Sequence, residues 1–209
     1  IKLLLRGDTP RLIDEWQIAP RFWDAGRNEV DQRDEDGQFI LTGSAVPPNF
    51  DEIFHTGTGR FAWLKLRTMS LWESGDSTGE VSLARLFAND AEDYFVEGIN
   101  QIDLERLAYL TCRGGWPKAL NKKTEKAALQ QAIEYFEAVT SFDISRVDDA
   151  NRDSELARRI MRSYARNQGS QATAGTILAN IISNESSEIS ANTIYSYLKA
   201  LKKIFVIED

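Results

Sequence analysis

The sequence predicts an α/β fold for the first part of the chain and an all-α region, ending in a winged-helix-like module, for the remainder. Two short apolar runs enclose a helix-length segment near the N-terminus, whereas from residue 103 onward apolar residues recur with the 3.6-residue period of helices. The charge changes as well, because the first 100 of the 209 residues carry a net charge of −8 and the rest carry +1. We therefore expect three parts, at 1–100, 101–150 and 151–209.

The first elements are expected to form a strand, a helix and a second strand. Residues 11–16 read RLIDEW, two apolar residues running into paired acids, which is typical of a short buried strand. Pro20 opens a segment whose apolar residues share one helical face, and QFILTGS at 38–44 indicates a second buried strand. This order and spacing predict a βαβ unit with parallel strands.

A third strand is expected after the paired prolines Pro47 and Pro48. The segment RFAWLKLRTMSL at 60–71 alternates larger and smaller apolar side chains in its first half. A loop rich in Gly, Ser and Asp at 73–80 ends it.

The second half is expected to be helical. Apolar stripes predict helices near 104–110 and 129–139, with a turn at 113–120 (RGGWPKAL) between them. Three further helices are expected at 153–166, 171–183 and 190–203, the last capped by Ser190, and IFVIED at 204–209 is expected to be a closing strand. Three short helices and a strand are typical of a winged helix-turn-helix module.

The strongest candidates for chemistry are the adjacent carboxylates Asp14 and Glu15. Two acids at the end of a buried strand are costly unless a site uses them, although a strand that simply runs into a solvated loop gives the same pattern. The next strand ends at Ser44, and ligands bind at the carboxyl edge where parallel strands end. We therefore expect Asp14, Glu15 and Ser44 to lie at one edge of the sheet.

Several longer stretches resemble one family, the bacterial and archaeal AAA-type ATPases that carry a C-terminal domain of unknown function. The stretches are TPRLIDEWQ (9–17), FILTGSA (39–45), GTGRFAWLKLRTMSLWESG (57–75), GEVSL (79–83), CRGGWPKAL (112–120), SFDISRV (141–147) and YLKALKKIFVIED (197–209). The resemblance covers nearly the whole chain and implies a partial P-loop NTPase sheet.

The resemblance also implies roles for single residues. Asp14 would hold Mg²⁺ through water, Glu15 would be the catalytic carboxylate that orients the attacking water, and Ser44 would sense the terminal phosphate of ATP. Arg60 would approach a phosphate, within the chain or across a subunit interface. The alternative for Arg60 is a surface position or a structural ion pair.

One family motif is missing, the Walker A loop G-x-x-x-x-G-K-[ST] that holds phosphates with backbone N–H groups and a lysine. We therefore expect a fragment of a longer ATPase that binds Mg²⁺ and ATP only together with a preceding segment. The intact protein is expected to hydrolyse ATP and to use the cycle to rearrange its C-terminal region. The fragment alone is expected to be inactive and to form homo-oligomers through its exposed sheet edge.

A different class of function stays open, a non-catalytic winged-helix module on an inherited NTPase-like scaffold. Residues 151–203 carry a local charge of +4 in a chain of net charge −7, which is too acidic overall for binding of nucleic acid by charge alone. DNA contacts are expected on the outward face of the last helix, at Asn192, Ser196, Lys199 and Lys203. The same module could instead dock a protein.

The histidine and cysteine content and the lengths of the apolar runs limit the kinds of site and the location that the sequence allows. His55 is the single histidine, so a zinc site with several histidines is excluded. Cys112 is the single cysteine, which fits a reducing compartment, and we expect a cytoplasmic protein. No apolar run reaches the length of about 18 residues that a membrane span needs, so no membrane partner is expected.

Overall fold

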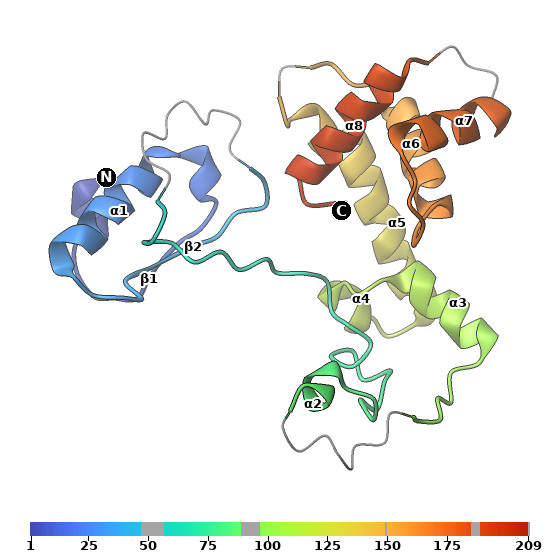
Figure 1. The fold of residues 1–209 in the computed structure, drawn as a ribbon, viewed down its shortest axis with the longest axis horizontal. Helices are drawn as coiled ribbons and strands as arrows, with labels where there is room; N and C mark the ends of the chain where they lie inside the picture. Colours follow the sequence, from blue (N-terminus) through green and yellow to red (C-terminus); the bar gives the residue numbers. More distant parts are fainter. Residues whose placement is uncertain (47–56, 89–96, 149, 185–188, 209) are drawn as a thin grey trace. The chain divides into compact units, whose positions relative to one another are not determined.

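The computed structural model describes residues 1–46, 57–88, 97–148, 150–184 and 189–208 (Figure 1). They form two compact units, one made of 1–63 together with 138–209 and the other of 64–137. Helices dominate the described residues, and none of these helices is long and apolar enough to cross a bilayer. Each unit is described by itself.

The chain begins with the expected strand, helix and strand. The elements are η1 (Lys2–Leu5), β1 (Arg11–Ile13), η2 (Trp16–Ile18), α1 (Arg21–Arg33) and β2 (Phe39–Leu41). The two strands pair in parallel, with Leu12 opposite Ile40, so the predicted βαβ unit is confirmed. The expectation that these strands are buried is wrong, because Leu12 and Ile40 are 61% and 52% exposed.

The core of this region lies around Trp23 of α1 instead. Trp23 is 5% exposed, and its ring stacks on that of Phe61 with 3.9 Å between centroids, while the Trp16 ring centroid lies 5.2 Å from that of Trp23. Gly57 has φ +70°, and a Cβ at this position would meet both Phe61 and Trp23 at 2.5 and 2.7 Å. Glycine at 57 therefore lets the chain turn directly against the stacked rings.

The predicted fold class is wrong, because the described residues contain no P-loop NTPase sheet and carry only the pair β1 and β2. The expected third strand is absent, since the described chain from Phe61 to Ser70 forms no regular element. Trp63, Leu64 and Leu66 are 76%, 92% and 93% exposed. A β-strand forms only where its backbone can hydrogen-bond to a neighbouring strand. The alternation of apolar side chains in this segment does not show that such a neighbouring strand is present.

The unit of residues 64–137 is helical. Its elements are α2 (Leu83–Leu86), α3 (Leu104–Arg113), α4 (Pro117–Leu120) and most of α5 (Glu125–Ser141). The Asp103 side chain caps α3 by accepting from the Arg106 amide at 2.7 Å. The expected turn at 113–120 begins at Gly114, whose φ of +68° ends α3, and then continues into the short helix α4.

Asp76 connects the loop before α2 to α3. Its carboxylate accepts from Arg106 at 2.7 Å, from Arg113 at 3.0 Å and from the Ser74 hydroxyl at 2.8 Å. The Arg113 and Asp76 side chains are only 5% and 10% exposed. Burial alone would raise the pKa of Asp76, but the hydrogen bonds from the two arginines and Ser74 outweigh it and hold that pKa below its ordinary value.

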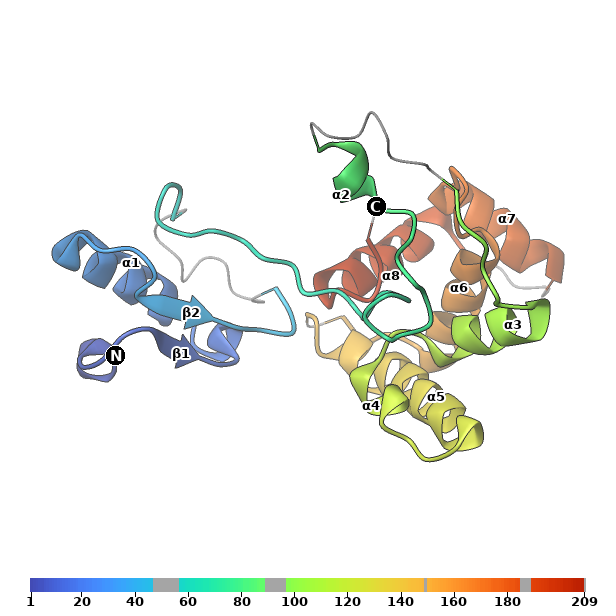
Figure 2. The same cartoon turned by 90° about the horizontal axis from the view of Figure 1, so that it is seen from below.

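Three helices close the chain, α6 (Ser154–Arg166), α7 (Ala174–Asn184) and α8 (Ala191–Lys203), preceded by η5 (Asp143–Ser145). Figures 1 and 2 show the three helices packed together, and each pair is in contact. Their buried side chains include Ile160, Ile177, Ile194 and Leu201. These three predicted helices are confirmed, including the cap of α8, because Ser190 Oγ accepts from the Thr193 amide at 3.1 Å.

The predicted closing strand is wrong. Residues after α8 form a Schellman turn, in which the Val206 amide donates to Leu201 O at 3.0 Å and the Phe205 amide donates to Lys202 O at 3.1 Å. Phe205 takes the left-handed conformation of this motif, with φ +57°. The described residues up to Glu208 therefore close the C-terminal end of α8. They do not form the strand that the predicted winged-helix module needs.

Candidate functional site

The backbone places Asp14 and Glu15 directly after β1 and opposite the end of β2. Pairing continues past both strands, since the Thr42 amide donates to Ile13 O at 2.9 Å and the Trp16 amide donates to Thr42 O at 3.1 Å. Glu15 has φ +52°, a left-handed conformation that is uncommon outside glycine. A strained backbone conformation persists only where the surrounding structure holds it in place, and such residues cluster at functional sites.

Two hydroxyl groups from the end of β2 reach the two carboxylates. Thr42 Oγ1 donates to Asp14 Oδ1 at 2.5 Å, and Ser44 Oγ donates to Glu15 Oε2 at 3.2 Å. The Gln17 side-chain amide donates to Glu15 Oε2 and lies 3.5 Å from Ser44 Oγ. We call these five residues the carboxylate cluster, and it brings together the predicted residues Asp14, Glu15 and Ser44.

Each carboxylate in the carboxylate cluster is held by one oxygen. Within the described residues, both hydrogen bonds to Asp14 fall on Oδ1 and both hydrogen bonds to Glu15 fall on Oε2. Asp14 is exposed and Glu15 is half-buried. The arrangement fixes both groups while leaving Asp14 Oδ2 and Glu15 Oε1 for a ligand or a water molecule.

Gly43 lets the two chain segments approach. A Cβ on Gly43 would meet the Gln17 side-chain oxygen and would lie 3.3 Å from Trp16 Cδ1. Gln17 Oε1 is itself buried without a hydrogen-bond partner. The Thr-Gly-Ser sequence at 42–44 therefore supplies two hydroxyl groups on either side of a residue with no side chain.

The described residues bring no group of three or more His, Cys, Asp or Glu side chains together that could hold a metal ion. Magnesium does not need such a group, because it keeps several of its waters and uses one or two carboxylates. The donor set of the carboxylate cluster therefore fits a hydrated magnesium ion held through Asp14. His55 lies outside the described residues.

Arg60 is not brought into the carboxylate cluster. Its Nε donates to Asp31 of α1 at 2.9 Å, and its Nη1 lies 3.4 Å from Thr58 O. These contacts match the structural ion pair that the sequence left as the alternative.

The four residues expected to contact DNA lie on α8 in different surroundings. Asn192, Ser196 and Lys199 are exposed, and Lys203 is half-buried. Ser196 Oγ lies 3.4 Å from Nη2 of the buried Arg152, which also forms a bidentate pair with Asp148 at 2.6 and 3.1 Å. Three of the four predicted contact residues are therefore exposed, and their contact with DNA stays a prediction.

Sequence reasoning missed Thr42 and Gln17. Thr42 stood in the same Thr-Gly-Ser sequence as Ser44, so a hydroxyl two residues before a candidate on a strand was an available signal. No signal marked Gln17, because its place depends on the left-handed turn at Glu15.

Comparison with protein families gives one match. The family model of a domain of unknown function, DUF8612, matches residues 104–209, just over half of the chain. The chain belongs to this family. The comparison with curated proteins and the comparison with solved structures each gave no match. The DUF8612 region includes α3 to α8 and excludes the carboxylate cluster, which lies before residue 45.

Proposed function

We propose that this DUF8612 protein takes part in magnesium-dependent ATP hydrolysis, with the carboxylate cluster as part of the catalytic site. The observation that carries the proposal is the pairing of two adjacent carboxylates with two hydroxyl groups at the carboxyl ends of parallel strands. Ligands of open parallel sheets bind at this edge. The AAA-type resemblance of residues 9–17 and 39–45 gives independent support for the same residues.

The proposal assigns a different task to each residue. Asp14 would hold the hydrated magnesium ion, which would supply neutralisation of charge on the phosphates when bound. Glu15 accepts a hydrogen bond from the attacking water and orients it toward the terminal phosphorus. Ser44 and Gln17 fix the Glu15 carboxylate, and Thr42 fixes that of Asp14. The attacking water would form the new P–O bond and pass a proton to Glu15, as the bond between the terminal phosphorus and the ADP oxygen breaks.

The sequence contains no Walker A loop, so the proposal includes a phosphate-binding segment from outside these 209 residues. Cytoplasmic ATP is the natural substrate, and the single cysteine fits that compartment. Turnover would reorient the helical DUF8612 region. The activity is therefore proposed for the full-length gene product.

The test compares the full-length protein with its Glu15→Gln variant. We expect turnover to fall by two orders of magnitude or more, as for loss of a positioned base, while a fluorescent ATP analogue still binds with magnesium. Glu105→Gln is the matched control, because Glu105 is an exposed acid at the start of α3. Full turnover by Glu15→Gln, or no ATP binding by the wild type, would contradict the proposal.

A further inference from the structure

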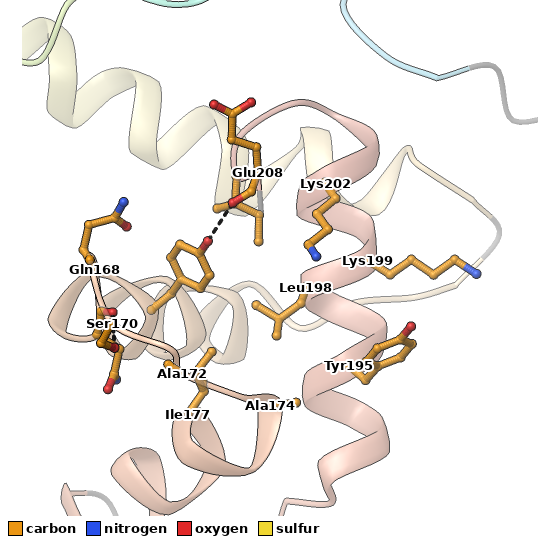
Figure 3. Close-up of a pocket in the computed structure, with 14 residues that line it drawn as sticks. Gln168, Ser170, Ala172, Ala174, Ile177, Tyr195, Leu198, Lys199, Lys202 and Glu208 are labelled. Carbon is orange, nitrogen blue, oxygen red and sulfur yellow. Dashed lines mark hydrogen bonds between the residues drawn. The ribbon is translucent and has the colours of Figure 1, made fainter.

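A cavity of about 470 Å³ lies within the DUF8612 region, between α8, the end of α6 and the start of α7 (Figure 3). This volume is in the range of cavities that hold small organic ligands. Its lining combines apolar side chains, amides and hydroxyls with two lysines. The lining includes Tyr195, Leu198, Lys199, Lys202, Ile177 and Glu208.

One stripe of α8 forms the rim of this cavity. Tyr195, Lys199 and Lys202 follow at intervals of four and three residues, which places them on one helical face. Tyr195 is 66% exposed, and both lysines are exposed. Figure 3 shows Tyr195 and Lys199 extending from the same side of α8, while Leu198 points into the cavity.

The cavity favours an anionic ligand with a flat apolar group. Its charged lining residues are two lysines and Glu208, and Figure 3 shows the Glu208 carboxylate pointing away from Tyr195 and Ile177. The Glu208 carbonyl already accepts from the Tyr164 hydroxyl at 3.2 Å. An exposed tyrosine ring next to lysines is the combination with which proteins stack bases and bind phosphates of single strands.

We propose that this cavity binds single-stranded nucleic acid. One unstacked base lies against the exposed Tyr195 ring at the rim of the cavity, and the adjacent phosphates lie at Lys199 and Lys202. The shape decides against a duplex, because a helix that reads the major groove must protrude, whereas this stripe of α8 borders a concavity. The proposed site shares Lys199 with the DNA-contact residues predicted from the sequence, but it includes Tyr195 and Lys202, which that prediction did not name.

The experiment is fluorescence anisotropy with the full chain and a labelled oligothymidine of about 16 nucleotides, the upper end of known single-strand sites. An oligouridine and a DNA duplex of equal length are the other probes. We expect both single strands to bind more tightly than the duplex. Tyr195→Ala should weaken binding by at least about fivefold, the lower limit for one stacked base, and Tyr195→Phe should retain it.

The lysines are tested by salt dependence. Lys199→Gln with Lys202→Gln should reduce the slope of log K against log salt by about 1.4, since each phosphate contact on a single strand contributes about 0.7. Lys122→Gln with Lys123→Gln is the control, because it removes the same charge from an exposed segment after α4. Absent binding, equal binding of the duplex, or an unchanged slope would overturn the proposal, whatever the outcome of the ATPase test.

Discussion

Ser44 Oγ donates a hydrogen bond to Glu15 Oε2 at 3.2 Å, although 29 positions separate the two residues in the chain. The contact exists because β1 and β2 are parallel neighbours, so their carboxyl ends meet at one edge. The Thr42 to Asp14 bond repeats the relationship two residues before Ser44, directly after the end of β2. Two hydroxyl groups thus hold two carboxylates in place, and the proposed hydrolysis depends on these fixed positions.

Removing the Ser44 hydroxyl should slow the proposed reaction without preventing ATP binding. A hydrogen bond to a charged group contributes about 1.5 to 3 kcal/mol, so Ser44→Ala in the full-length protein should lower kcat by about tenfold or more. Ser44→Thr keeps the hydroxyl and should recover most of the rate. Ser183→Ala, at an exposed serine of α7, is the control. An equal loss of ATP affinity and kcat would argue for a general structural defect instead.

Asp76→Ala should destabilise the unit of residues 64–137. The change leaves the buried Arg113 without its carboxylate, and breaking such a pair is costly. We expect about 2 kcal/mol, less than for a fully buried pair because water reaches the Arg106 side. Amide hydrogen exchange in α3 measures the loss. Glu125→Ala breaks only an exposed contact of Arg106, so exchange in α3 should change far less.

The lowered pKa values of Asp76 and Asp148 predict that the protein loses stability in acid. The folded pKa of Asp76 is lowered, and that of Asp148 is lowered by its hydrogen bonds from Arg152. A lowered folded pKa stabilises the fold above the unfolded value and loses that contribution as the pH falls through the folded pKa. Stability should therefore fall below about pH 4, the ordinary value of a free aspartate.

Circular dichroism in urea at several pH values follows this acid-dependent loss. Asp148→Asn should give a shallower decline between about pH 4 and pH 2, because this group no longer titrates. Asp36→Asn is the matched control at an exposed aspartate. An identical decline in wild type and Asp148→Asn would show that this pair does not govern the acid response.

The parts of the fold that the sequence predicted are those specified by local contacts. The period of Ile194, Tyr197 and Leu201 identifies the buried face of α8, and Ser190 marks its start. Parallel pairing of β1 and β2 followed from the helix-length connection between them, which α1 fills. The helices and the βαβ unit could therefore be read from spacing alone.

The errors concern segments whose structure depends on distant partners. The chain after Arg60 has a strand-like pattern, yet Phe61 stacks on Trp23 and the following residues pair with no strand. The apolar end Ile204 to Ile207 was expected as a strand, but the left-handed Phe205 closes a Schellman turn there. Likewise, acids and hydroxyls of the carboxylate cluster were predictable from strand ends, whereas the place of Gln17 depends on the turn at Glu15.

Two tyrosines of α8 separate a structural role from the proposed binding role. The buried Tyr197 hydroxyl accepts from the Asp153 amide at 2.8 Å, just before α6. Tyr197→Phe leaves that amide without its partner and should lower the free energy of unfolding by about 1 kcal/mol. Tyr195→Phe, at an exposed ring, should leave stability unchanged. Urea unfolding of both variants checks this, and equal stability of the two would show that the Tyr197 to Asp153 bond contributes nothing to holding α6 against α8.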